Sequence, residues 1–222
     1  IGAEKADTAG DFWAKENGLD FRIDWLRGQK TGFFIDQRDN RSLLEHYAKD
    51  KEVLNMFCYT GGFSVYALRG GAKLVHSVDV SQKAIDLVRS NVAHNFGENA
   101  PHEAFAEEAF EFMANNQNKY DLIILDPPAF AKHRDAVKNA LRGYQRLNAK
   151  GIQSIRPGGI LFTFSCSQAI DKDMFRLAVF SAAAQVGRKV RILHQLHQPA
   201  DHPINIYHPE GEYLKGLVLQ VE

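Results

Sequence analysis

The chain has 222 residues, of which 45% are hydrophobic and 24% are charged, as in an ordinary globular domain with a full core. Its 27 basic and 27 acidic residues give a net charge of zero, so affinity for a polyanion requires a local patch or a segment outside this sequence. The sequence has no signal peptide and no apolar run of membrane-spanning length, so we expect a protein that does not enter a membrane. We expect its two cysteines to be reduced thiols, which indicates a cytoplasmic protein. Because the chain begins at Ile1 rather than Met, we expect it to be a piece of a longer protein.

The beginning of the chain predicts a linker and a small β-hairpin. Residues 1–20 are polar and unpatterned. Residues 21–26 alternate like a half-buried strand, and after a turn residues 31–35 return as a second strand. We interpret the polar residues 36–41 as a solvated loop that leads into a helix over residues 42–49.

The segment from Val53 to Asp79 predicts a strand, a glycine turn, a helix and a second strand that ends in an acidic residue. Gly61 and Gly62 form the turn, where the missing Cβ atoms let a ligand approach the backbone beside the start of the helix. Asp79 follows about 20 residues later, the separation at which an acidic residue binds ribose hydroxyls. The glycines do not spell G-x-G-x-x-G, so a nucleoside without a diphosphate, such as S-adenosylmethionine (SAM), fits better. An ordinary βαβ unit with a turn glycine stays open from this segment alone.

Helices and strands alternate through the rest of the chain until two strands follow each other. The predicted elements are a helix from Ser81 to Gly97, a strand and helix over 104–113, a strand at 121–125, a helix at 134–156, a strand at 160–164, a helix at 174–184 and strands at 189–196 and 213–221. The alternation predicts a mostly parallel, doubly wound α/β sheet, and the final pair predicts an antiparallel C-terminal edge. This is the Rossmann-like layout of class I methyltransferases. We accordingly divide the chain into a linker and hairpin subdomain, residues 1–41, and a methyltransferase domain, residues 42–222.

An Asp-Pro-Pro loop follows the buried strand at residues 121–125. Ligands of open α/β sheets bind at the carboxyl ends of the strands, so we expect Asp126 to face the same crevice as the glycine turn. Asp126 can accept a hydrogen bond from an exocyclic amine, and Phe130 can stack on a planar substrate. The alternative is a rigid strand exit with a core phenylalanine.

Cys166 follows the next strand between two serines, which places a thiol in the same crevice. A cysteine thiol has an ordinary pKa near 8.5 and needs activation before it acts as a nucleophile. The alternative is a buried and inert cysteine. The other cysteine, Cys58, is interpreted as a small packing residue next to the glycine turn.

The helix predicted at residues 134–156 carries a basic stripe beside its apolar one. The stripe consists of Lys132, Arg134, Lys138, Arg142, Arg146 and Lys150. Most charged helix faces are simply solvated, but this one begins beside the expected crevice and is a candidate track for phosphates. The histidines near residues 194–208 lack the spacing of a metal site, so we expect no metal.

With these residues assembled, the chain resembles the bacterial RlmI-type methyltransferases that modify carbon 5 of a cytosine in large-subunit rRNA. The resemblance runs over almost the whole length from residue 30 onward. It is carried by residues 30–38 (KTGFFIDQR), 59–63 (YTGGF), 77–79 (SVD), 126–128 (DPP), 142–144 (RGY), 163–167 (TFSCS), 200–203 (ADHP), 209–211 (PEG) and 213–216 (YLKG). Such enzymes carry an RNA-binding PUA domain ahead of the part given by this sequence.

The resemblance implies SAM as the methyl donor, RNA as the partner and Cys166 as the nucleophile, with Asp126 as the second catalytic residue. It places the cofactor site at Tyr59, Thr60, Gly61, Gly62, Phe63, Asp79, Asp126 and Pro127, and it maps the acidic contact to the adenine onto Glu108, where the family more often has Asp. The substrate site is expected at Phe130, Lys132, Arg134, Lys138 and Arg142. Many related enzymes have a second cysteine where this chain has Ala129. Which group removes the proton from carbon 5 therefore stays open.

Two other functions stay open beside this one. A SAM-dependent methyltransferase acting on an exocyclic amine, of RNA or of another substrate, needs no cysteine. A non-catalytic module that binds SAM or RNA would keep the fold without transferring a methyl group. The oligomeric state is left open, with a homodimer as one option.

Overall fold

A seven-stranded sheet forms the centre of the molecule in the computed structural model, which describes residues 11–24, 32–131, 134–208 and 211–222. The strands lie in the order β5-β4-β3-β6-β7-β9-β8; the first five are parallel, and β9 is antiparallel to both β7 and β8. Their bounds are β3 Glu52–Met56, β4 Leu74–Asp79, β5 His102–Ala106, β6 Tyr120–Leu125, β7 Ile155–Ser165, β8 Val190–His197 and β9 Lys215–Val221. The predicted mostly parallel sheet with an antiparallel edge is confirmed.

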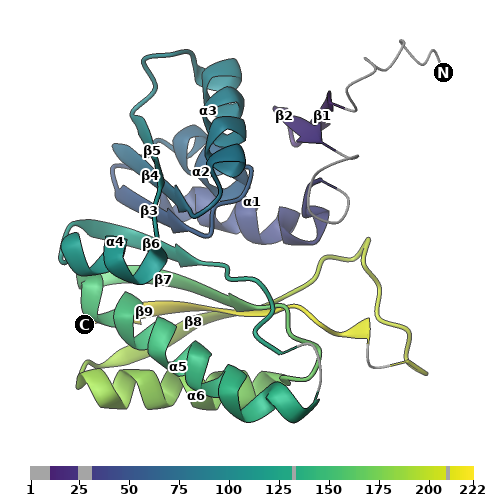
Figure 1. Ribbon diagram of the computed structural model, residues 1–222, viewed down its shortest axis with the longest axis vertical. Coiled ribbons are helices and arrows are strands. Elements are labelled where there is room, and N and C mark those ends of the chain that lie inside the picture. The colour runs from purple at the N-terminus through teal and green to yellow at the C-terminus, as the bar shows by residue number, and fades with distance from the viewer. Residues whose placement is uncertain (1–10, 25–31, 132–133, 209–210) are drawn as a thin grey trace.

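Helices cover both faces of this sheet. They are α1 Arg38–Tyr47, α2 Gly62–Arg69, α3 Gln82–Phe96, α4 Ala109–Asn115, α5 Val137–Ser154 and α6 Lys172–Val186, with short 3₁₀ turns η1 at Ile35–Gln37 and η2 at Arg134–Ala136. In Figure 1, α1, α2 and α3 lie in the upper part of the molecule, and α5 and α6 lie together at the bottom. This is the doubly wound arrangement expected from alternating helices and strands.

The central strands are rich in apolar residues because both of their faces are covered. In β3, Val53 packs in a cluster with residues of α1 and α2, whereas its neighbour Leu54 packs with residues of α4, α5 and α6. In β6, Ile124 joins the first cluster and Ile123 the second. The two cores fix the sheet on both sides, so the loops at the carboxyl ends of its strands start from rigid positions.

The β-hairpin exists, but the predicted pairing of its strands is wrong. Its strands are β1, Asp11–Glu16, and β2, Leu19–Asp24, which pair antiparallel. The turn is Asn17-Gly18, whose positive φ angles of 49° and 84° suit the twist of a two-residue hairpin. The strand predicted at residues 21–26 is therefore the second strand and not the first, and the predicted turn at 27–30 lies outside the described residues.

The hairpin packs on α3 and is tied to α1. The backbone N–H of Arg22 donates to Asn91 Oδ1 at 2.7 Å. Arg41 of α1 forms a buried ion pair with Glu16 of β1, in which Nη2 of Arg41 lies 2.8 Å from each carboxylate oxygen. The predicted boundary between residues 41 and 42 falls inside α1, and the division of the chain into two domains stays a prediction.

The polar residues 36–41 do not form the solvated loop that we expected. They form η1 and the first turn of α1, and Asp36, Gln37, Asn40 and Arg41 are buried. Several of their polar groups are buried together with partners: Asn40 Nδ2 donates to Gln37 Oε1 at 2.7 Å, and Tyr213 Oη donates to Asp36 Oδ2 at 2.6 Å. Burial is tolerated because hydrogen bonds replace those to water.

Candidate active site

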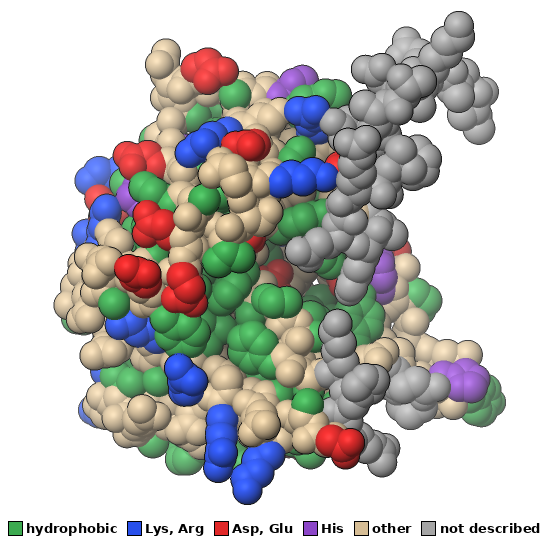
Figure 2. Space-filling view, viewed as in Figure 1, with side chains coloured by type: hydrophobic (Ala, Val, Ile, Leu, Met, Phe, Trp, Pro, Cys, Tyr) green, Lys and Arg blue, Asp and Glu red, His purple; other side chains and the backbone are tan. Residues whose placement is uncertain are grey.

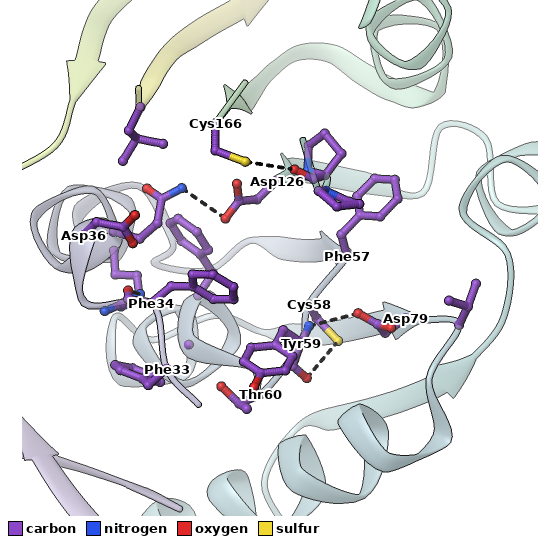
Figure 3. Close-up of a pocket in the computed structure, with 18 residues that line it drawn as sticks. Phe33, Phe34, Asp36, Phe57, Cys58, Tyr59, Thr60, Asp79, Asp126 and Cys166 are labelled. Carbon is purple, nitrogen blue, oxygen red and sulfur yellow. Dashed lines mark hydrogen bonds between the residues drawn. The ribbon is translucent and has the colours of Figure 1, made fainter. Parts of the chain in front are cut away.

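A cavity lies at the carboxyl ends of β3, β4, β6 and β7, where the sequence predicts the ligand crevice. Its wall combines the loop after β3, the end of β4, the Asp-Pro-Pro loop after β6, the residue after β7 and the segment around η1. Figure 2 shows a hollow at the centre of the displayed face, bordered by hydrophobic side chains. In Figure 3, Cys166 and Asp126 lie at one end of the cavity, and Tyr59 and Asp79 lie at the other.

The loop between β3 and α2 has the backbone geometry that the glycine turn predicts. Gly61 is the residue before α2 and has a φ of 80°, and a Cβ placed there would lie 3.0 Å from Val88. Phe57 and Tyr59, which line the cavity, also have positive φ angles, of 58° and 48°. Such backbone is energetically unfavourable for residues with side chains and clusters at functional sites. Gly61 therefore shapes the loop while Tyr59, Thr60, Gly62 and Phe63 line the cavity.

Asp79 sits at the end of β4 and holds this loop in place. Its Oδ2 accepts the backbone N–H of Tyr59 at 3.1 Å, and its Oδ1 accepts the N–H of Ser81 at 3.0 Å. A carboxylate has about four acceptor sites, so these two bonds leave acceptor capacity on the cavity side. A pair of ribose hydroxyls suits such a group, so the residues present fit a bound nucleoside.

At the other end of the cavity, Asp126 is positioned by a residue from the segment around η1. Gln37 Nε2 donates to Asp126 Oδ2 at 3.0 Å, and Gln37 is itself held by Asn40. A dashed line in Figure 3 marks this hydrogen bond to Asp126. Pro127 and Pro128 follow on the same wall. Our sequence interpretation missed Asp36 and Gln37 as cavity residues, because residues 36–41 are all polar and no spacing distinguishes those that become buried.

The two cysteines have different surroundings. Cys166 follows β7, is partly exposed and lines the cavity, with its Sγ 4.0 Å from the carbonyl oxygen of Pro127. The next residue, Ser167, is buried, and its Oγ contacts Tyr144 Oη at 2.9 Å and accepts the Ala131 N–H at 3.2 Å. Cys58 is buried, and burial together with the charge of Asp79 raises the pKa of its thiol well above the ordinary value. Cys166 is thus held on a fixed backbone and open to the cavity, whereas Cys58, which also lines the cavity, is buried and has a raised thiol pKa.

Two predicted site residues, Glu108 and Phe130, lie outside the lining of the cavity. Glu108 precedes α4 and accepts the N–H groups of Phe110 at 2.8 Å and Glu111 at 3.1 Å, so it caps that helix. Phe130 packs on Tyr144, with ring centroids 4.6 Å apart. Neither lines the cavity within the described part of the chain. Their proposed contacts to ligand stay predictions.

The basic stripe of α5 lies on the surface. Lys138 and Arg142 are exposed, and Arg146 lies over the Phe110 ring with its guanidinium 5.6 Å from the centroid. Figure 2 shows Lys and Arg side chains over the lower part of the molecule, where α5 and α6 lie. Lys132 lies outside the described residues, and the structure describes only the backbone of Arg134.

Among the described residues, no three histidine, cysteine or acidic side chains gather as a metal site. None of the helices in the described ranges is long and apolar enough to cross a membrane.

Comparison with known sequences identifies a family of enzymes to which this chain is similar. The sequence profile of the S-adenosylmethionine-dependent methyltransferases matches residues 6–213. The chain is 47% identical over 210 residues to a ribosomal RNA large subunit methyltransferase I of Alteromonas mediterranea and 44% identical over 209 residues to one of Tolumonas auensis. Each alignment covers 93% of this chain and 53% of the relative, so the chain spans about half the length of the curated relatives it matches.

Solved structures agree on the fold. A putative methyltransferase complexed with SAH is 26% identical, with a TM-score of 0.86 over 99% of this chain and 58% of that chain. A putative SAM-dependent methyltransferase from Streptococcus mutans gives the same identity and TM-score over 100% of this chain and 57% of that chain. The tRNA m1G37 methyltransferase of M. jannaschii, at 18% identity and a TM-score of 0.66 over 98% of this chain and 59% of that chain, shares the fold alone. The predicted fold class is confirmed.

Proposed function

The chain belongs to the S-adenosylmethionine-dependent methyltransferase family, and on that premise we propose that it methylates carbon 5 of a cytosine in large-subunit ribosomal RNA. The observation that carries the proposal is a partly exposed thiol, Cys166, in the same cavity as Asp126 and Asp79. The names of its curated relatives support an rRNA substrate.

The chemistry requires a nucleophile because carbon 5 of cytosine is itself a poor one. In this mechanism the Cys166 thiolate forms a bond to carbon 6, and the electron pair of the 5,6 double bond makes carbon 5 nucleophilic. When bound, SAM supplies the methyl group that carbon 5 takes. Loss of the carbon 5 proton to a base and breaking of the sulfur–carbon bond restore the aromatic ring and the thiolate.

Asp126 would bind the edge of the base that carries N3 and the exocyclic amine. Gln37 holds one oxygen of this carboxylate at 3.0 Å, which supports a fixed orientation toward the cavity. The rigid Asp-Pro-Pro loop adds to that orientation. A target base has to be unpaired or extruded to enter a cavity of this kind.

The cofactor would occupy the end of the cavity formed by the loop after β3 and the end of β4. Asp79 would accept hydrogen bonds from the ribose hydroxyls, and Tyr59, Thr60, Gly62 and Phe63 would surround the nucleoside. Their position on the cavity wall supports this assignment. Pro127, which is also predicted to contact the cofactor, follows Asp126, and its own carbonyl oxygen lies 4.0 Å from the Sγ of Cys166.

The test uses methyl-labelled SAM, the intact protein and large-subunit rRNA from cells that lack the native modifications, followed by digestion to nucleosides. We expect label in 5-methylcytidine. Cys166→Ala should abolish transfer and leave SAM binding nearly intact, because the thiol lies at the opposite end of the cavity from Asp79. Cys58→Ala is the matched control, since it removes the other thiol and should retain transfer.

Other outcomes would contradict the proposal in distinguishable ways. Label in a different nucleoside, still formed by Cys166→Ala, would select methylation of an exocyclic amine. SAM binding without any transfer by the intact protein would indicate a binding module. Loss of SAM binding in Cys166→Ala would refute the division of the cavity into two ends.

A further inference from the structure

A buried lysine lies next to the segment that carries Cys166. Lys215 is the first residue of β9, pairs in register with Ser165 at the end of β7, and is 6% exposed. Its Nζ donates to the carbonyl oxygen of Ser167 at 2.6 Å and to that of Tyr213 at 2.9 Å. The ammonium therefore bonds to the backbone of the residue that follows Cys166 directly.

A buried ammonium is unfavourable unless an opposite charge compensates it. No carboxylate in the part of the chain that the structure describes forms an ion pair with Lys215; the nearby Glu212 pairs with Lys172 instead, at 2.6 Å. Asp171 and Glu212 attract Lys215 only at longer range. Burial accordingly lowers the pKa of Lys215 to about 8.

We propose that Lys215 is a positioning residue that keeps Cys166 in its reactive thiolate form. The ammonium supplies positive charge to the segment that carries the sulfur, and its bond to the Ser167 carbonyl fixes the backbone of that segment. Coulombic attraction to Cys166 raises the pKa of Lys215, and because attraction between two charges is mutual, the ammonium favours the thiolate of Cys166. The inference rests on the proposed role of Cys166 as the nucleophile.

The other groups around Cys166 do not replace this charge. Asp126 and Asp36 line the same cavity, and as carboxylates they oppose a thiolate. Burial raises the pKa of the Tyr144 and Tyr213 hydroxyls, so both stay neutral near pH 7. Arg41 also lines the cavity, but Glu16 pairs with its guanidinium, whereas Lys215 is a buried cation that bonds to the backbone next to Cys166.

The test follows alkylation of Cys166 by iodoacetamide as a function of pH in the intact protein. Peptide mass spectrometry reports Cys166 separately from Cys58, and neither SAM nor RNA is needed. We expect the wild-type rate to reach half its maximum below the ordinary thiol pKa of about 8.5. Lys215→Met should raise that midpoint by about one pH unit and slow alkylation at pH 7 about 10-fold. Lys172→Met is the control, because it removes a nearby exposed cation and should leave the midpoint unchanged.

Lys215→Arg keeps the charge and separates electrostatics from packing. A low midpoint in this variant, beside a raised one in Lys215→Met, would support the proposal. An equal rise in both would assign the effect to packing and overturn it. If Lys215→Met does not fold, the wild type alone decides, because a midpoint at or above about 8.5 overturns the proposal. Alkylation involves no methyl transfer, so it tests Lys215 independently of the reaction. A low midpoint in a protein that does not methylate cytosine would support the effect of Lys215 on the Cys166 thiol and refute the proposed function.

Discussion

Asp36 sits beside the cavity as a buried carboxylate. Its Oδ2 accepts the hydroxyl of Tyr213 at 2.6 Å, and its Oδ1 is buried with no hydrogen-bond partner among the described residues. Burial and the Asp36 carboxylate together raise the pKa of Tyr213, so the phenol stays protonated and donates. The hydrogen bond from the Tyr213 hydroxyl therefore offsets much of the free-energy cost of burying the Asp36 carboxylate.

Tyr213→Phe should consequently destabilise the fold. It leaves both Asp36 oxygens without a side-chain donor, and we expect the free energy of unfolding to fall by about 1–3 kcal/mol. Urea denaturation measures the change. Tyr207→Phe is the control, because Tyr207 is 86% exposed and should change stability little. Equal effects of the two substitutions would show that the Asp36 contact contributes nothing.

Some residues of the cavity could be predicted from the sequence, whereas others could not, because their contacts join distant parts of the chain. Asp79 ends a predicted strand, and Asp126 and Cys166 come soon after predicted strands, so their place at the sheet edge could be predicted. Gln37 meets Asp126 from 89 positions away, and Asp36 meets Tyr213 from 177. Such pairings depend on the packed fold and leave no local pattern.

At the level of elements, the turn from β3 into α2 has little tolerance for a side chain at Gly61. Its φ of 80° is unfavourable for other residues, and an added Cβ would lie 3.0 Å from Val88 of α3. Asn91, one turn further along α3, donates to the carbonyl of Thr60 at 2.8 Å and so holds the same loop. The position of α3 and the shape of the loop therefore depend on each other.

Gly61→Ala should weaken both folding and SAM binding. Gly18→Ala is a matched control: Gly18 has a φ of 84°, but an added Cβ would meet nothing within 4 Å. We expect the control to lose about 1–2 kcal/mol from backbone strain alone and to keep SAM affinity. Gly61→Ala should lose more, with reduced SAM affinity. Urea denaturation and calorimetric titration with SAM measure the two effects, and identical behaviour of the variants would contradict a steric role for Gly61.

The ends of elements could be predicted where a local capping signal exists. Ser81 was expected to cap its helix, and Ser81 Oγ accepts the Ala84 N–H at 3.3 Å at the start of α3. The start of α1 was placed too late because Gln37, the residue before it, makes no side-chain capping bond. A helix without such a cap begins where tertiary packing places it.

For the molecule as a whole, a net charge of zero does not mean that basic residues are spread evenly over the surface. Lys138 and Arg142 are exposed on α5, which follows the Asp-Pro-Pro loop at the carboxyl ends of the strands. Lys49 and Lys51 are equally exposed, but they precede β3 at the amino end of the sheet. RNA that approaches the carboxyl ends of the strands would meet the start of α5, whereas residues 49 and 51 lie at the opposite edge of the sheet.

Replacing Lys138 and Arg142 together by alanine should therefore weaken rRNA binding. Loss of two phosphate contacts should reduce the slope of log affinity against log salt by about 1.5 to 2, while SAM affinity stays the same. Filter binding to unmodified rRNA at several salt concentrations measures the slope. The double alanine variant of Lys49 and Lys51 is the control, and an equal loss in both would show that α5 is not the RNA track.

The position of β9 has a consequence for the order in which the protein is made. β9 follows β8 in sequence but lies between β7 and β8 in the sheet, so β8 has no place to pair until residues 215–221 have been synthesised. Domains fold as their chain emerges from the ribosome, yet here the sheet stays open at β7 until β9 arrives. Lys215 begins that same strand. A nascent chain that already contains Cys166, Asp126 and the glycine turn therefore still lacks the lysine that binds the backbone beside the cysteine, and it gains that contact only when the sheet closes.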